Sequence, residues 1–530
     1  MKRTVLVWMA LVLTMAATGQ TLNVKVGSVV YQFPADQTGE MTYTDGTKVT
    51  IMGRTFALSD IDEMTVDGTE VKNNLVAVEY DAGGAMVYVA GNVAQYVEPT
   101  LSGAHVTIAQ SNTEAVDDGE ITYQLSGTTA DGSLTLSGSY KCTVSLADVT
   151  LTNPSGAAIN ITNSKRIQIS AKKGTTNTLT DGGRGEQKAC IYSKGQIQLQ
   201  GNGVLNVVGK TAHGIKSGDY ISIKNLTLNI ISAVSDGINC VEYFQMKSGV
   251  VNISGVGDDG IQCDLGGEKS TGETEDHDDE DSGNIYIEAG TLTLDVATKG
   301  IKAQGDLRIT GGTITATSSG HEAIEAKGVM TIEDGTVYAF SKTDDAINSG
   351  SHMYLKGGTV TGVSNGNDGI DSNGNLYIEG GTVIACGTGQ PECGVDAAER
   401  YKLYITGGTV LAIGGGNNTV TSTSGSQCVL STTGSPTAGT AVSVKSGSTE
   451  LASFTVPTGY SPSSGGFGGG GFGGFGFGGG GGRPGGGGQS GSSSFSYLLS
   501  CPGLTSGTSY TVTIGSSSSS CRAATSYSGR

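Results

Sequence analysis

The tetrapeptide Gly369-Ile370-Asp371-Ser372 is one copy of a motif that organises the middle of the chain. Each copy has a small residue, then Ile or Val, then a polar residue, then a second small residue. The apolar position falls at Ile191, Ile215, Ile238, Ile261, Ile301, Ile324, Ile347, Ile370 and Val395. Within two regular runs, 215–261 and 301–370, this position recurs every 23 residues. Self-similarity at a fixed period of this length predicts a solenoid.

Each repeat is predicted to form three short strands. The unit contains brief runs of Ile, Val, Leu and Thr separated by Gly, Asn and Asp, and it has no helical periodicity. A second marker, a Thr that follows a Gly, keeps nearly the same step at Thr291, Thr313, Thr336, Thr359 and Thr382. The expected fold class is therefore all-β, a right-handed single-stranded parallel β-helix with three strands in each coil.

Two positions of the motif are expected to face the core. Side chains two residues apart on a strand share a face, so the small residue after the Ile also points inward. Cys240 and Cys263 occupy that position, and we interpret them as small core residues; a disulfide between adjacent coils is the alternative. The pairs Cys386–Cys393 and Cys501–Cys521 are spaced as loop disulfides of an exported protein.

Composition divides the chain into segments. The predicted boundaries are a signal peptide at 1–19, a β-rich lead-in domain or cap at 20–99, the β-helix at 100–415, a C-terminal β cap at 416–514 and a Ser-rich tail at 515–530. The β-helix carries an acidic insert at 264–283, and the cap carries a Gly-rich loop at 465–488. We expect this loop to be disordered and the tail to be mobile.

The first residues have the features of an export signal. Lys2 and Arg3 precede an apolar run at 5–16, and residues 17–19 form an acceptable cleavage site that leaves Gln20 first. No later segment is long and apolar enough to span a bilayer. We therefore expect a secreted or cell-surface protein without a transmembrane segment, and we expect a monomer.

The charge of the chain limits its partners. The formal net charge is −18 at pH 7, and loss of Lys2 and Arg3 with a signal peptide leaves −20. Nucleic acid is excluded as a partner, because no basic face is present to replace phosphate counterions. A polyanionic partner requires bridging cations.

Oxygen-bearing side chains gather around the motif. They precede the Ile by two or three residues or follow it closely, so successive coils stack them along one edge. The candidate metal ligands are Asp236, Asn239, Asp258, Asp259, Asp264, Asp344, Asp345, Asn348, Asp368 and Asp371.

This donor set favours Ca²⁺. Carboxylates stacked about 4.8 Å apart repel one another unless one is protonated or two share a cation. Hard oxygen ligands suit Ca²⁺ better than zinc or a redox metal. The alternatives are Asp and Asn side chains that cap their own turns, or a salt-bridged ladder with Lys299 and Lys302. The acidic insert is either a solvated loop or a flap that calcium orders.

A second outward column is aromatic. Strands such as Leu376-Tyr377-Ile378 alternate, with the apolar residues inside and the Tyr outside. The candidate carbohydrate contacts are Tyr286, Tyr354, Tyr377 and Tyr404, together with Lys302. The alternative is that these rings stack on one another and stiffen the sheet.

These features resemble a known family. The Asp-Gly-Ile coils, the segment 176–181, and the Gly-Gly-Thr strands that begin at Gly311, Gly357, Gly380 and Gly407 resemble the bacterial carbohydrate-binding β-helix family, which binds cellulose and pectic polysaccharide. The similarity covers roughly 140–415. That family looks like the calcium-dependent pectate lyases, in which an Asp-Asp-x-x-Asp cluster holds the metal and a Lys or Arg abstracts a proton. The resemblance thus implies a polysaccharide partner and Ca²⁺.

The lyase pattern is incomplete here. Gln262 replaces its third Asp in one coil, and Asn348 replaces it in another. We therefore predict a secreted, non-catalytic protein that binds acidic, pectate-like or cellulosic polysaccharide through a calcium-bearing face. A calcium-dependent pectate lyase, with Lys302 or Lys299 as the base, is the first alternative. A structural or adhesive surface protein is the second.

Overall fold

The structure is a computed structural model that describes residues 19–266, 282–462 and 495–529. The predicted signal peptide up to residue 18, residues 267–281 of the acidic insert and the Gly-rich loop at 465–488 lie outside these residues. The described chain forms two compact units. Unit 1 is 1–297 with 301–307, and unit 2 is 298–300 with 308–530.

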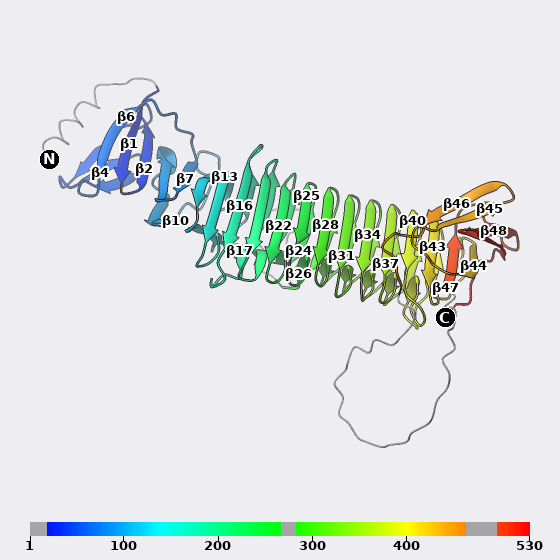
Figure 1. The fold of residues 1–530 in the computed structure, drawn as a ribbon. Coiled ribbons are helices and arrows are strands. Elements are labelled where there is room, and N and C mark those ends of the chain that lie inside the picture. Colours follow the sequence, from blue (N-terminus) through cyan, green and yellow to red (C-terminus); the bar gives the residue numbers. More distant parts are fainter. Residues whose placement is uncertain (1–18, 267–281, 463–494, 530) are drawn as a thin grey trace, which may run out of the picture. The chain divides into compact units, whose positions relative to one another are not determined.

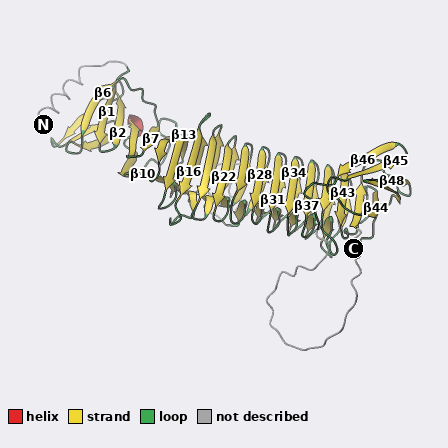
Figure 2. Cartoon of the chain, in the orientation of Figure 1, coloured by secondary structure: helices red, strands yellow, loops and turns green. Residues whose placement is uncertain are grey.

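Almost all of the regular structure is β-strand, and one helical turn, η1 (Gly91–Val93), accompanies it in the described ranges (Figure 2). None of the helical structure described is long and apolar enough to cross a membrane.

Unit 1 begins with strands that lead into the solenoid. Its first strands are β1 (Thr21–Val26), β2 (Val29–Pro34), β3 (Thr42–Thr44), β4 (Lys48–Ile51), β5 (Arg54–Ala57), β6 (Glu63–Asp67), β7 (Leu75–Asp81) and β8 (Gly84–Ala90). Strand β1 pairs antiparallel with β2 and β6, while β7 pairs in parallel with β11 (Ile121–Thr129). This parallel pairing joins the lead-in to the first coils.

The coils of unit 1 begin irregularly and then repeat. The first strands are β9 (Val97–Ser102), β10 (Ala104–Gln110), β12 (Gly132–Ser137) and β13 (Cys142–Asn153). The Ile strands, which carry the motif, are β14 (Ile159–Ile161), β17 (Ala189–Ser193), β20 (His213–Ser217), β23 (Ile238–Val241), β26 (Ile261–Asp264) and β29 (Ile301–Ala303). The second column is β15 (Ile167–Ala171), β18 (Ile197–Gly201), β21 (Ile221–Lys224), β24 (Tyr243–Met246) and β27 (Asn284–Ile287). The third column is β16 (Thr176–Asp181), β19 (Val204–Gly209), β22 (Thr227–Ala233), β25 (Val250–Ser254) and β28 (Thr291–Val296) (Figure 1).

Unit 2 repeats the same three columns, and β30 (Leu307–Ile309) contains the point at which the chain passes between the units. Its Ile strands are β32 (Ile324–Ala326), β35 (Ile347–Ser349), β38 (Ile370–Ser372) and β41 (Val395–Ala397). The second column is β33 (Met330–Ile332), β36 (Met353–Leu355), β39 (Leu376–Ile378) and β42 (Leu403–Ile405). The third is β31 (Thr313–Ser318), β34 (Thr336–Ser341), β37 (Thr359–Ser364), β40 (Thr382–Cys386) and β43 (Thr409–Gly414).

The register between coils confirms the parallel β-helix. In unit 2, Ile347 lies opposite Ile370, and Asn348 lies opposite Asp371. The motif's Ile and Val side chains are all fully buried, and so are the Ser, Ala and Cys side chains two residues later. Adjacent coils therefore keep equivalent residues in line, with the apolar positions inside.

Glycine is required where the Gly-Gly-Thr strands begin. Gly358 and Gly381 both have a φ of +70°, which L side chains rarely adopt. A Cβ added to Gly358 would also lie 2.4 Å from the carbonyl oxygen of Gly335 on the previous coil. The second Gly thus permits both the turn and the close coil spacing.

All nine cysteines are buried and free. The interpretation of Cys240 and Cys263 as small core residues is confirmed. The predicted bridges Cys386–Cys393 and Cys501–Cys521 are wrong, because these thiols are used as buried packing groups. Three of them, Cys386, Cys501 and Cys521, belong to the apolar core of the C-terminal region.

The C-terminal cap contains β44 (Val429–Gly434), β45 (Ala441–Ser446), β46 (Thr449–Thr455), β47 (Phe495–Ser500), β48 (Ser509–Ile514) and β49 (Ser517–Arg522). Strand β47 pairs antiparallel with both β43 and β44, and β46, β45, β48 and β49 form a separate sheet. The prediction of a mobile tail at 515–530 is wrong. Strand β49 pairs with β48, and burial of Cys521 and Ala523 fixes it to the cap core.

Candidate functional site

The central residues of the Ile strands form an outward polar column in each unit. In unit 1 the register aligns Asn160, Tyr192, Lys216, Asn239, Gln262 and Lys302. In unit 2 it aligns Glu325, Asn348, Asp371 and Asp396. Period-two alternation explains this column, because the residues on either side of each member point into the core.

In unit 1, Asp236 is buried at the centre of a hydrogen-bond network. Its Oδ1 accepts the backbone N–H of Asp259 at 3.2 Å, and its Oδ2 accepts Nδ2 of Asn239 at 2.9 Å. Oδ2 also lies 3.1 Å from Nδ1 of His213. The Asn239 amide reaches Asp264 Oδ2 at 3.4 Å as well. Four of the predicted ligands therefore meet, and their hydrogen bonds also tie successive coils together.

Asp258 and Asp259 lie beside Asp236. Carboxylate oxygens of these three residues are all within 4.8 Å of one another. Asp258 is exposed and Asp259 is buried. The ammonium of Lys302 lies 3.1 Å from Asp259 Oδ2 and donates to Gln262 Oε1 at 2.9 Å. The cluster thus combines a salt bridge with three carboxylates.

Unit 2 repeats the arrangement around Asn348. Its Nδ2 donates to Asp345 Oδ2 at 2.9 Å and to Asp371 Oδ2 at 3.0 Å. Asp345 Oδ1 accepts the backbone N–H of Asp368 at 3.0 Å. Burial, together with the charge of Asp371, raises the pKa of the Asp345 carboxyl well above its usual range. The Asn348 amide nitrogen therefore lies between the carboxyl groups of Asp345 and Asp371. Burial disfavours negative charge at this position.

Asp368, Asp371 and Asp396 form a second cluster of three carboxylates within 4.8 Å of one another. Burial, with the charges of Asp345, Asp396 and Asp371, raises the pKa of Asp368 to about 9, against the effect of a hydrogen bond from the Cys393 N–H. Asp396 occupies the outward column in register with Asp371. It was not among the predicted ligands, although its position in the repeat marks it.

The side chain of Asp344 belongs to a cluster that does not include its chain neighbour Asp345. It groups with His321 and Glu322, whose possible ligand atoms lie within 4.8 Å. His321 Nδ1 is 3.8 Å from Asp344 Oδ2. This third cluster was not predicted, although His321 and Glu322 stand in the columns three and two residues before Ile324. Its imidazole nitrogen suits transition metals better than the all-oxygen clusters do.

Both candidate bases, Lys299 and Lys302, form salt bridges with acidic side chains. Lys299 lies 3.2 Å from Glu322 and donates a short hydrogen bond to Glu325. Burial opposes the charge on Lys299, but the hydrogen bond with Glu325 and both carboxylate charges outweigh it and raise its pKa. Lys302 is paired with Asp259, so each candidate base has an acidic partner in contact with it.

The tyrosine column of unit 2 is a ring stack. Tyr354 and Tyr377 have centroids 4.8 Å apart and an interplanar angle of 3°, and Tyr377 and Tyr404 are 5.1 Å apart at 10°. Both faces of Tyr377 are thus covered by rings, and its hydroxyl accepts a hydrogen bond from Asn375 Nδ2 at 2.9 Å. Tyr286 in unit 1 meets Tyr243 edge-on at 6.3 Å. The geometry favours the stiffening role for Tyr377.

A family model described as a carbohydrate-binding domain-containing protein matches residues 102–383. The matched stretch is 282 of the 530 residues, which is more than half of the chain. The chain belongs to this family. The stretch shared with other carbohydrate-binding domain-containing proteins contains all ten predicted metal ligands, from Asp236 to Asp371, and confirms the resemblance to the carbohydrate-binding β-helix family. Tyr404 and Asp396 lie beyond it.

A solved structure is also similar to the chain. It is described as the polysaccharide lyase-like protein from C. thermocellum in a gadolinium derivative, with a TM-score of 0.40 and 22% identity, and the match covers 49% of this chain and 99% of that one. No curated protein matches the chain.

Proposed function

We propose that this carbohydrate-binding protein holds an acidic, pectate-like polysaccharide through Ca²⁺ ions on the outward edge of its coils, without cleaving it. Cellulosic polysaccharide is the neutral alternative. The observation that carries the proposal is the recurrence of three close carboxylates beside the outward column, at Asp236, Asp258 and Asp259 and again at Asp368, Asp371 and Asp396.

The residues present fit Ca²⁺. The three acidic residues of each cluster offer carboxylate oxygens, and neighbouring Asn239 and Asn348 supply amide oxygens if their side chains rotate. In the first cluster, a bound Ca²⁺ would take the place of the Lys302 ammonium beside Asp259. Burial and the neighbouring carboxylates raise the pKa of Asp368 to about 9, so negative charge is disfavoured there. A divalent cation bound among these carboxylates would relieve that repulsion. A bound Ca²⁺ supplies positive charge that bridges the protein's carboxylates to those of a uronate. Such bridging is needed because the formal net charge is −18.

The pairing of the lysines supports binding without cleavage. A lyase base must be neutral and free to remove a proton beside the uronate carboxyl. The Lys302 ammonium contacts Asp259 and Gln262, and Lys299 contacts Glu322 and Glu325. We also propose that the protein acts outside the cytoplasm, since polysaccharides of this kind are extracellular and the sequence begins with the features of an export signal.

The test is retention of the purified protein on polygalacturonate in millimolar Ca²⁺ and in chelator, with absorbance of unsaturated product followed in parallel. We expect retention in Ca²⁺, loss of retention in chelator, and no product. A neutral polymer such as cellulose is the matched control.

Retention that chelator leaves unchanged would contradict the calcium bridge. Unsaturated product that disappears in Lys302→Ala would instead establish the lyase alternative. Retention on cellulose that equals retention on polygalacturonate would assign the protein to neutral polysaccharide.

A further inference from the structure

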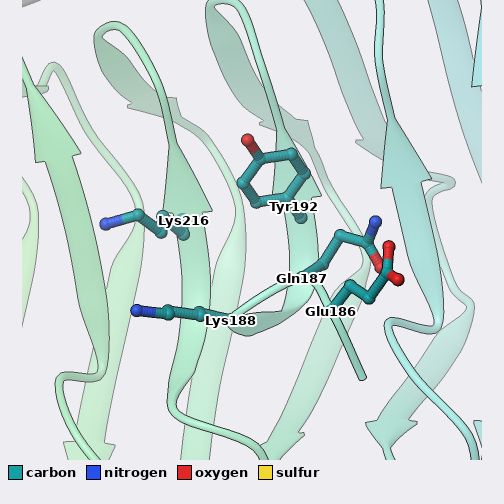
Figure 3. A pocket seen from close by; sticks show the side chains of 5 residues that line it. All are labelled: Glu186, Gln187, Lys188, Tyr192 and Lys216. Carbon is teal, nitrogen blue, oxygen red and sulfur yellow. The ribbon is translucent and has the colours of Figure 1, made fainter.

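A hollow lined mainly by residues with polar or charged groups lies on unit 1, one coil before the Asp236 cluster. It has a volume of about 280 Å³ and is lined by Glu186, Gln187, Lys188, Tyr192 and Lys216 (Figure 3). This volume is just below the range of about 300–1,000 Å³ typical of pockets for drug-sized ligands, so it suits one sugar unit. None of these residues except Lys216 touches the candidate calcium ligands.

Two lysine side chains line the hollow. Lys188 is exposed and Lys216 is half-buried. Figure 3 shows both side chains extending to the same side, away from the carboxylate of Glu186. Lys216 donates one short hydrogen bond to Asn239 Oδ1, and an ammonium has three N–H donors, so further donors remain for a ligand. The hollow is thus lined by two cations and one carboxylate, in a chain with 49 acidic and 31 basic residues.

The other lining groups suit a sugar ring. Tyr192 is half-buried in the outward column, in register with Lys216, and its ring borders the hollow on the side opposite Lys188 (Figure 3). Aromatic rings pack against the apolar C–H face of a pyranose while polar groups around them bond its hydroxyls. The Gln187 amide offers both a donor and an acceptor for those hydroxyls.

We propose that this hollow is a second sugar subsite, which binds one uronate unit directly, with its carboxylate between Lys188 and Lys216 and its ring on Tyr192. The inference rests on the proposed function, because it assumes an acidic polysaccharide. Unlike the proposed calcium sites, this subsite needs no metal ion. Charge-assisted hydrogen bonds from ammonium groups hold the carboxylate there.

The subsite is continuous with the calcium cluster. Lys216 contacts Asn239, and Asn239 contacts Asp236, so one side-chain amide separates the two. Adjacent coils are about 4.8 Å apart. A polyuronate that lies along the outward column would therefore meet the lysine pair first and the calcium-bearing carboxylates one coil later.

The test is titration of trigalacturonate in chelator, followed by calorimetry. The variants are Lys188→Glu and Tyr192→Ala, and the matched control is Lys173→Glu, which makes the same charge change on an exposed side chain that does not line the hollow. We expect the wild type and the control to bind equally. We expect Lys188→Glu to weaken binding by at least about tenfold, the factor for one charge-assisted hydrogen bond. Tyr192→Ala should weaken it severalfold.

Cellotriose distinguishes an acidic subsite from a neutral one, and it should bind far more weakly than trigalacturonate. Equal affinity of the wild type and Lys188→Glu for trigalacturonate, or no binding in chelator, overturns the subsite. Retention of the long polymer in Ca²⁺ tests the calcium bridge, and titration in chelator tests the subsite. Either proposal can therefore be refuted without the other. Circular dichroism of each variant verifies the fold.

Discussion

Asp345 and Asp368 are joined across two coils by a hydrogen bond of 3.0 Å from the backbone N–H of Asp368 to Oδ1 of Asp345. Asp236 and Asp259 repeat the same bond at 3.2 Å in unit 1. One oxygen of each first Asp therefore fastens the next coil, while its second oxygen accepts from the Asn that follows. The same carboxylate serves both the fold and the candidate site.

We expect Asp345→Ala to cost about 1–3 kcal/mol of unfolding free energy, because the Asp368 N–H is left without its acceptor. Asp345→Asn keeps an oxygen acceptor, so it should cost less. Both variants remove a candidate calcium ligand and should reduce the calcium-dependent rise in melting temperature. Denaturant unfolding in chelator measures the first effect, and equal stability of the two variants would show that the hydrogen bond contributes nothing.

Removal of Ca²⁺ is expected to lower the melting temperature. A ligand that binds only the folded state at a hundredfold excess over its Kd stabilises it by about 2.7 kcal/mol. Calorimetric scans in millimolar Ca²⁺ and in chelator make the comparison, and Mg²⁺ is the control for ionic strength. An unchanged melting temperature would count against Ca²⁺ ligands in the clusters.

Ile347→Asp should unfold the middle coils of unit 2, since it places an unpaired charge at a fully buried position. Thr331→Asp on β33, which points outward, is the matched control. Circular dichroism and thermal melting should show a large loss for the first variant and a small one for the second. Equal melting of both would refute the inward assignment of the Ile column.

Lys302→Ala is expected to reduce stability by roughly 1.5–3 kcal/mol, because the buried Asp259 loses a charged partner. Retention on polygalacturonate should remain largely intact if calcium and not Lys302 holds the polymer. Affinity electrophoresis at a temperature below the melting point of the variant separates the two effects. A loss of retention by the folded variant would instead make Lys302 a sugar contact.

Tyr377→Ala should lower stability by about 1–3 kcal/mol, since the central ring of the stack makes two ring pairs worth about 0.5–1.5 kcal/mol each. Retention on polysaccharide should change little, because both faces of this ring are covered. Tyr377→Phe is the control that keeps the stack. Strong loss of retention without loss of stability would instead indicate that the tyrosine column contacts the sugar.

The coils could be predicted because the motif Ile recurs every 23 residues, as at Ile347 and Ile370. Alternation then placed Asn348 and Asp371 in one outward column, and the register confirms this. It could not predict that Asp345 and Asp368 are buried, since they lie in the turn before the strand, where no period fixes the direction of a side chain.

Two further features could not be predicted from the sequence, and the reasons differ. Strand β49 consists mostly of Ser, which has little preference for strands, and it is specified by its pairing with β48. The grouping of His321 with Asp344 depends on contacts between two coils, which an alignment of columns suggests but does not measure. Tertiary pairing, and not local pattern, decides such features.

Strand β47 covers a strand edge near the end of the solenoid. The last coil of a parallel solenoid exposes strand edges that another copy could extend in the same direction, as in a fibril. In unit 2, β47 runs antiparallel against β43 and occupies its edge from Val410 to Gly414. An incoming coil would have to displace a strand of the opposite direction. Strand β47 thus occupies the edge of β43 that parallel pairing with a second copy would need.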